Sequence, residues 1–229
     1  MSRNKKARIA GILYLSLIIC GFTYLVYVPL QLIDLQDAAK TVDNIKNSEL
    51  LFRVGIVTAI CSFLIFIMLP LALYDLLQSV NKVCAKFMVL FALISVPISF
   101  VNILHKFSVL TLIDKSGYVE KLGQTELQTQ VMLHLEYYNN GIELSQIFWG
   151  LWLLPFGYLV YTSGFLPKIL GIFLMAGCCG YLITFFGGFL YSGFQETFIA
   201  NIVGFPAPIG EIGICLWLLI MGTNKPRFK

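Results

Sequence analysis

The sequence predicts an all-α, polytopic membrane protein: a bundle of six transmembrane helices formed by one domain over residues 1–229. Of the 229 residues, 58% are hydrophobic and only 12% are charged, whereas about a quarter of the residues are charged in an ordinary soluble domain. The mean hydropathy of +0.82 comes from long apolar runs separated by short polar stretches. No segment shows the alternating pattern of about ten residues that is typical of strands in a membrane barrel.

Six apolar runs are candidates for membrane-spanning helices. The first follows a basic N-terminus but continues to Leu30 without a small-residue cleavage site, so we expect an uncleaved span. The last run is short, and the apolar segment Phe198–Phe205 before it is too short to cross alone. We therefore predict that Phe198–Phe205 is a re-entrant or interfacial piece. The predicted spans are Ile9–Leu30, Leu51–Tyr74, Phe87–Ile113, Gly141–Tyr161, Pro167–Tyr191 and Pro208–Gly222.

Basic residues are concentrated in alternate connections between these runs, where Asp75 is the only acidic residue. Cytoplasmic loops of membrane proteins are enriched in Lys and Arg, so both termini are predicted to be cytoplasmic, as an even number of spans also requires. The net charge of +4 is then explained by membrane orientation, and no nucleic-acid partner is predicted. The basic residues concerned are Arg3, Lys5, Lys6, Arg8, Lys82, Lys86, Lys168, Lys225, Arg227 and Lys229.

The longest connection, Asp114–Asn140, contains helical signals. Thr125-Glu-Leu-Gln128 matches a capping box, and Leu127, Val131 and Leu135 recur at helical spacing. Either the fourth helix begins well outside the membrane, or a short helix lies on the outer surface.

Two spans carry polar stripes that we expect to face the interior of the bundle, because polar and small residues avoid lipid. Pro155 in the fourth span removes one helical hydrogen bond, which predicts a kink at Leu151. The stripe of the fourth span is Glu143, Gln146, Gly150, Leu154, Gly157 and Tyr161; that of the third is Ser95, Ser99, Asn102 and Lys106.

Four charges that sum to zero come from four spans and lie at similar depth near the outer face. Ionisable groups inside a membrane are costly and commonly functional, so we predict an outward-facing site for a small or amphiphilic ligand, for transport, or for another membrane protein. The alternative is a structural clamp, because Arg53 can snorkel to the interface and Glu211 lies at a helix N-terminus. The predicted site comprises Arg53, Asn102, Lys106, Glu143, Gln146 and Glu211.

Catalytic motifs are absent from the sequence: there is no GxSxG and no Cys/His arrangement, so no catalytic residue is assigned. Neither HExxH nor HxxxH occurs, and we predict no metal and no cofactor; His105 is expected to be hydrogen-bonded and His134 solvated. The alternatives are an intramembrane enzyme that acts on lipid or peptide, with His105 and Glu143 as acid and base, and a structural or accessory subunit. A homo-oligomer is compatible with each. The metal ligands considered are His105, His134, Glu136 and Glu143.

Several short motifs resemble those of an uncharacterised family of bacterial integral membrane proteins, a domain of unknown function. The resemblance extends over nearly the whole chain and implies a bacterial inner-membrane protein of about six helices, surrounded by the lipid bilayer, with no known activity. The motifs are Ala7-Arg-Ile-Ala-Gly11, Phe52-Arg-Val-Gly55, Leu69-Pro-Leu-Ala-Leu-Tyr74, Leu151-Trp-Leu-Leu-Pro-Phe-Gly-Tyr-Leu-Val-Tyr161, Ser163-Gly-Phe-Leu-Pro-Lys-Ile-Leu-Gly171, and Glu211 with Leu216-Trp-Leu-Leu219.

Overall fold

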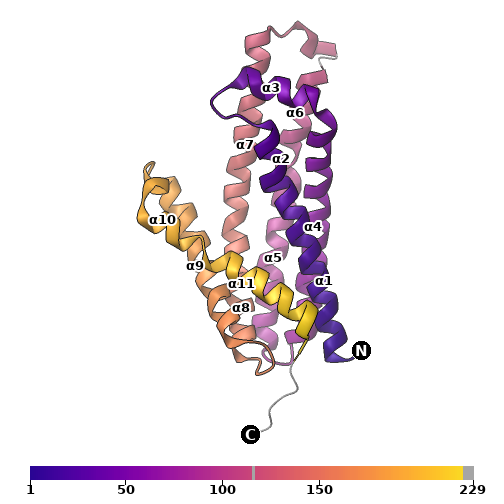
Figure 1. The fold of residues 1–229 in the computed structure, drawn as a ribbon, viewed down its shortest axis with the longest axis vertical. Coiled ribbons are helices and arrows are strands. Elements are labelled where there is room, and N and C mark those ends of the chain that lie inside the picture. Colours follow the sequence, from indigo (N-terminus) through magenta and orange to yellow (C-terminus); the bar gives the residue numbers. More distant parts are fainter. Residues whose placement is uncertain (115–116, 224–229) are drawn as a thin grey trace. The chain divides into compact units, whose positions relative to one another are not determined.

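The computed structural model describes residues 1–114 and 117–223, except for the side chain of residue 118. Every regular element in this part of the chain is a helix, which confirms the all-α prediction (Figure 1). The elements are α1 (Arg3–Phe22), η1 (Thr23–Tyr27), α2 (Val28–Leu32), α3 (Ala38–Asn47), α4 (Glu49–Leu77), α5 (Lys82–Asn102), α6 (Leu104–Asp114), η2 (Gly117–Lys121), α7 (Gln124–Leu151), α8 (Leu153–Thr162), α9 (Lys168–Leu190), η3 (Phe194–Glu196), α10 (Phe198–Val203), α11 (Pro206–Leu216) and η4 (Trp217–Met221).

Six helical stretches are long and apolar enough to cross a membrane, as the sequence predicts. Many of their large apolar side chains are exposed, as expected for residues that face lipid. The cytoplasmic location of both termini stays a prediction, and Lys225, Arg227 and Lys229 lie outside the described residues. The six stretches are Arg3–Leu32, Glu49–Leu77, Lys82–Asp114, Gln124–Thr162, Lys168–Leu190 and Phe198–Met221.

The sixth span is longer than predicted. The apolar segment Phe198–Phe205 contains a separate short helix, α10, and together with α11 and η4 it forms a stretch, Phe198–Met221, that is long enough to cross; its re-entrant or interfacial placement stays a prediction. Pro206 and Pro208 do not prevent this arrangement, since they occupy the first turn of α11, where backbone N–H groups have no helical acceptor.

The prediction that the fourth helix begins well before its apolar run is confirmed, because α7 starts at Gln124. The capping box is wrong: the helix already includes Thr125, whose carbonyl accepts a hydrogen bond from Thr129 Oγ1 at 2.9 Å. The kink is confirmed as a break at Trp152, between α7 and α8. Pro155 lacks the N–H that would donate to Leu151, which explains why the helix is interrupted there.

Residue contacts divide the chain into two compact units, which are described separately below. The boundaries between the units fall inside α1, α4, α5 and α7, and the prediction of a single domain stays a prediction. Unit 1 comprises Met1–Leu17, Ile65–Val96 and Glu143–Lys229, and unit 2 comprises Ile18–Leu64 and Pro97–Ile142.

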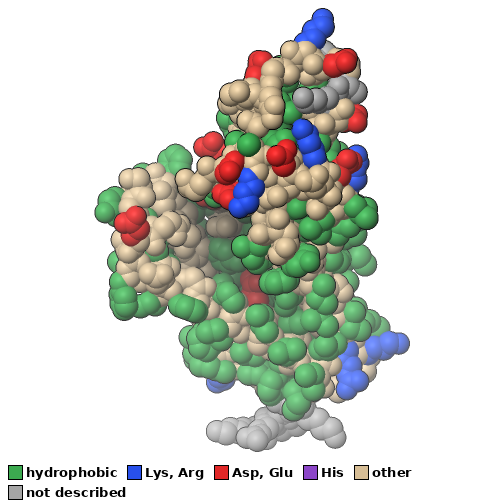
Figure 2. Space-filling view, turned by 45° about the horizontal axis from the view of Figure 1, so that its top comes forward, with side chains coloured by type: hydrophobic (Ala, Val, Ile, Leu, Met, Phe, Trp, Pro, Cys, Tyr) green, Lys and Arg blue, Asp and Glu red, His purple; other side chains and the backbone are tan. Residues whose placement is uncertain are grey.

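The core of unit 1 combines aromatic packing with close helix contacts. Trp152 stacks on Phe156, with ring centroids 5.3 Å apart, and meets Phe66 edge-on at 5.2 Å. Where α8 meets α9, a Cβ added at Gly171 would lie 2.6 Å from the Gly157 carbonyl oxygen, so glycine allows the two backbones to touch. Figure 2 shows hydrophobic side chains over much of the lower part of the view, with basic side chains at its lower right.

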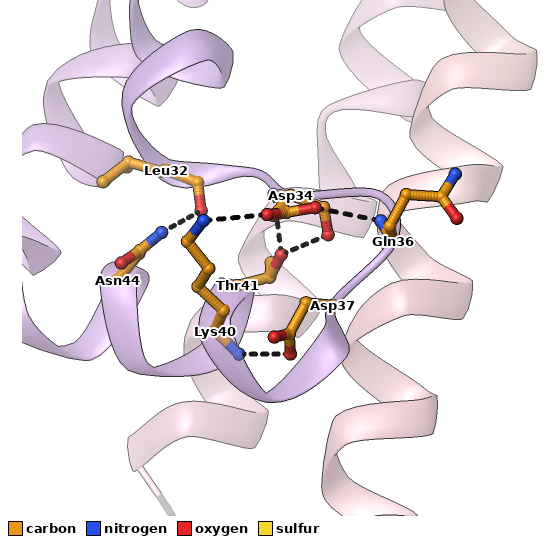
Figure 3. Close-up of polar contacts among 7 residues, drawn as sticks. All are labelled: Leu32, Asp34, Gln36, Asp37, Lys40, Thr41 and Asn44. Atoms are coloured by element: carbon orange, nitrogen blue, oxygen red, sulfur yellow. Dashed lines mark hydrogen bonds and ion pairs between the residues drawn. The ribbon is translucent and has the colours of Figure 1, made fainter.

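Unit 2 has an aromatic core and a polar cap. The Phe63 ring lies 5.9 Å from Tyr24 and 5.4 Å from Phe100. The turn between α2 and α3 is closed by an ion pair of Asp34 Oδ2 with Lys40 Nζ at 3.0 Å (Figure 3). The hydrogen bond from Lys40 and the backbone N–H of Gln36 hold the pKa of the Asp34 carboxyl below its ordinary value.

Candidate functional site

The most unusual side chain of unit 2 is Lys106 of α6, which is only 2% exposed. Its Nζ lies 4.4 Å from the ring centroid of Tyr138 of α7 and 5.5 Å from that of Phe52 of α4. Both aromatic residues are themselves buried. Three helices therefore enclose one ammonium group between two aromatic faces.

The polar stripe of the third span brings Lys106 to this position. Ser95, Ser99, Asn102 and Lys106 are all buried, which confirms that the stripe faces inward. The helix is interrupted at Ile103, between α5 and α6, and the Lys106 N–H donates to the Ile103 carbonyl at 3.0 Å.

Asn102 joins α5 to α7 one turn before the lysine. Its Nδ2 donates a hydrogen bond to the backbone carbonyl of Tyr138 at 2.8 Å. A Cβ on Gly141 would collide with the Asn102 carboxamide, so glycine is needed at this close approach. Asn102 and Gly141 thus fix the helix that presents the Tyr138 ring to Lys106.

The electrostatic balance around Lys106 is unfavourable. Burying an ammonium group costs several kcal/mol even after the surroundings relax, whereas a desolvated cation–π contact returns about 2 kcal/mol. Within the described residues of unit 2, no carboxylate lies within 4 Å of Nζ. The hydroxyl of Tyr138 is buried and has no hydrogen-bond partner in the same part of the chain. Among these described residues of unit 2, the ammonium therefore has no negatively charged partner at ion-pair distance.

Arg53, which the sequence places in the same cluster, faces away from this site. Its Nη2 and Nε both lie 2.6 Å from Glu49 Oε1, one helical turn earlier, and its side chain is exposed. The neighbouring Phe52 points to Lys106 instead, because adjacent residues on a helix differ by about 100° in direction. The ligand-binding role of Arg53 stays a prediction.

The other three predicted site residues belong to unit 1. Glu143 is exposed, and Gln146 and Glu211 are half-buried. No basic side chain in the described part of unit 1 lies within 4 Å of the Glu211 carboxylate. The roles of Glu143, Gln146 and Glu211 stay predictions.

The predicted inward face of the fourth span is only partly correct. Gly150 and Gly157 are buried, but Glu143, Leu154 and Tyr161 are exposed. Glu143 and Gly150 both precede the break at Trp152, so position on the helical wheel alone does not decide burial here.

His105 and His134, which the sequence groups only as candidate metal ligands, are in contact in the structure. Their Nδ1 atoms lie 3.3 Å apart, and the Tyr137 ring packs against both imidazoles. His134 lies on α7, which begins at Gln124, and its side chain is half-buried, so the expectation of a solvated His134 is only partly met. The described residues contain no group of three or more His, Cys, Asp or Glu side chains suited to a metal ion.

Sequence reasoning missed Tyr138 and Phe52, although Tyr138 had a signal. Leu127, Val131 and Leu135 repeat at helical spacing in the sequence, and Tyr138 continues their series. All four residues are buried on one face of α7. Phe52 has no comparable signal, because it belongs to a continuous apolar run.

Comparison with known proteins gives a family without an assigned activity. Residues 9–222 match a family described as "Domain of unknown function (DUF4386)". An "Uncharacterized protein" of Archaeoglobus fulgidus is 29% identical over 165 residues, which cover 71% of this chain and 82% of that protein. No solved structure matches the chain.

Proposed function

This chain belongs to the DUF4386 family, and we propose that it is a multi-pass membrane protein that binds the anionic group of an amphiphilic ligand at Lys106. The observation that carries the proposal is the buried Lys106 ammonium, which lies against the Phe52 and Tyr138 rings with no carboxylate of unit 2 within 4 Å. Buried charges in proteins are ordinarily paired or bind a ligand. An anion would supply the missing partner.

The chemistry around Lys106 favours a carboxylate or phosphate. The ammonium provides the charge, and the Tyr138 hydroxyl of α7, which has no partner among the described residues, is a second donor on the ring that faces the ammonium. A charge-assisted hydrogen bond to an anion is about twice as strong as a neutral one. The two groups together would select an anionic head over a neutral one.

An amphiphile fits the location of the site better than a hydrophilic ion. Lys106 lies within a stretch long and apolar enough to span the membrane, Lys82–Asp114. On the same stretch Val101, Leu104 and Phe107 are exposed, as expected for side chains that face lipid. A ligand that enters from the bilayer would need no aqueous path.

Oleate, with its uncharged methyl ester as the matched ligand, tests this proposal. Binding to the detergent-solubilised full chain is measured by isothermal titration calorimetry. We expect oleate to bind, the ester to bind at least tenfold more weakly, and Lys106→Met to remove this preference. Lys86→Met, the same change at an exposed lysine of α5, should leave oleate binding unchanged.

Equal binding of oleate and its ester by the natural chain would overturn the proposal. Full oleate binding by Lys106→Met would overturn it as well, because the anion would then be held elsewhere. The same titration with a phosphatidic acid in place of oleate separates a carboxylate preference from a phosphate preference.

A further inference from the structure

A second cluster in unit 2, distinct from Lys106, has the geometry of a metal site. His105 of α6 and His134 of α7 point their Nδ1 atoms at each other, 3.3 Å apart, with ring centroids 5.6 Å apart. Both side chains are half-buried, so they are held in place by packing and remain open to small ions.

The distance between the two nitrogen atoms matches the spacing of two ligands on one ion. Zinc is bound by imidazole nitrogen at about 2.0–2.1 Å in a tetrahedral arrangement, which places two ligand nitrogens about 3.3 Å apart. Each neutral imidazole would keep its proton on Nε2 and present the Nδ1 lone pair to the ion. The ion would then lie near the midpoint between the two rings, displaced to one side.

We propose that His105 and His134 bind a transition-metal ion of the class that prefers imidazole, such as Zn²⁺ or Cu²⁺, through their Nδ1 atoms. The remaining positions are filled by water or by a ligand, because no further His, Cys, Asp or Glu of the described chain completes a group of three. The site is therefore open and exchangeable, unlike a closed structural zinc site with four protein ligands.

The simplest rival explanation is a hydrogen bond between the two imidazoles, in which one ring donates its Nδ1 proton to the other. This arrangement needs opposite tautomers and binds no metal. It also gives no dependence of metal affinity on either histidine. Metal titration therefore separates the two explanations directly.

The test is titration of the full chain in detergent, purified without a polyhistidine tag, with Zn²⁺, Cu²⁺ and Ca²⁺. We expect one equivalent of Zn²⁺ per chain, tighter binding of Cu²⁺, and no binding of Ca²⁺, which prefers oxygen ligands. His105→Ala and His134→Ala should each lower Zn²⁺ affinity at least tenfold. Tyr137→Phe retains the ring that packs on both imidazoles and should bind Zn²⁺ normally.

Further measurements distinguish loss of metal binding from loss of the fold. His134→Gln replaces the imidazole with a polar side chain, and its metal-free melting temperature reports whether the fold persists. Lys106→Met should bind Zn²⁺ as the natural chain does, so failure of the anion proposal would not affect this one. Absence of stoichiometric Zn²⁺ binding, or unchanged binding in folded His105→Ala and His134→Gln, would overturn the inference.

Discussion

The helices of the two units pack together in different ways. Unit 1 brings helix backbones together at glycine: a Cβ at Gly177 would lie 2.8 Å from Cα of Ala207, and one at Gly210 would lie 2.9 Å from the Leu174 nitrogen. Unit 2 buries polar side chains between its helices, among them Asn102 and Lys106. Close packing stabilises a membrane helix bundle, whereas an uncompensated charge destabilises it.

This difference distinguishes a unit that acts as a structural framework from a unit that carries the candidate binding groups. The Leu151–Gly171 motif, which is the longest match behind the family resemblance, lies in unit 1 and forms the Gly157–Gly171 contact between α8 and α9. Lys106 and the histidine pair lie in unit 2. The four predictions below test whether unit 1 acts through packing and unit 2 through its polar groups.

The largest expected effect is on packing in unit 1. Gly171→Ala would place a methyl group 2.6 Å from the Gly157 carbonyl oxygen, so α8 and α9 must separate. We expect a loss of stability of about 3 kcal/mol, measured as a lower midpoint of thermal unfolding in detergent. Gly21→Ala, where no atom lies within 4 Å of the added Cβ, is the control and should not be destabilising.

The second largest expected effect is a gain of stability. Lys106→Met replaces a buried ammonium with an apolar side chain of similar length, and we expect the ligand-free protein to gain about 2 kcal/mol of stability. The measurement is thermal unfolding of delipidated protein, with Lys86→Met as the control. A large loss of stability would favour the structural clamp, in which the lysine charge holds helices together.

A smaller effect is expected at the contact between Asn102 and α7. Gly141→Ala would displace the Asn102 carboxamide and break its hydrogen bond to the Tyr138 carbonyl. The expected cost is about 1–2 kcal/mol, together with weaker oleate binding, because the Tyr138 ring moves from Lys106. If oleate affinity stays normal in a destabilised Gly141→Ala protein, Asn102 does not position the site.

The smallest effect is pH dependence at the cap of α3. The pKa of Asp34 is lowered in the folded state, chiefly by the hydrogen bond from Lys40, so its stabilising contribution is present above the ordinary pKa of 3.8 and is lost as the pH falls through the folded value. Asp34 also raises the pKa of Lys40, and that contribution is lost in strong alkali. Amide hydrogen exchange in α3 should therefore accelerate, after correction for intrinsic rates, below pH 4 but not between pH 5 and 8. Lys40→Gln should reduce this dependence.

The fold and half of the site could be predicted because they follow local patterns. Apolar runs of sufficient length define the six spans, and the spacing of Ser95, Ser99, Asn102 and Lys106 defines one helix face whatever surrounds it. The ion pair of Arg53 with Glu49 could also have been predicted, because residues four apart on a helix are neighbours.

The rest depends on contacts between helices. The contact between His105 and His134 requires α7 to start at Gln124, far from the apolar run of its span. The exposure of Glu143, which lies before the break near Trp152, does not follow from its position on the helical wheel. The spacing of Leu127, Val131 and Leu135 indicates the early start of α7 but not the partner of His134. The rings that enclose Lys106 come from separate helices, and no single segment determines how those helices align.

The most direct test of a ligand-binding lysine is nuclear magnetic resonance of the lysine Nζ groups in the full chain, labelled with ¹⁵N-lysine and solubilised in detergent. The spectrum of Lys106→Met identifies the Lys106 signal. We predict that oleate shifts this signal while methyl oleate does not, and that the Lys86 signal responds to neither. An unchanged Lys106 signal at saturating oleate would contradict the proposal that this buried ammonium binds an anion.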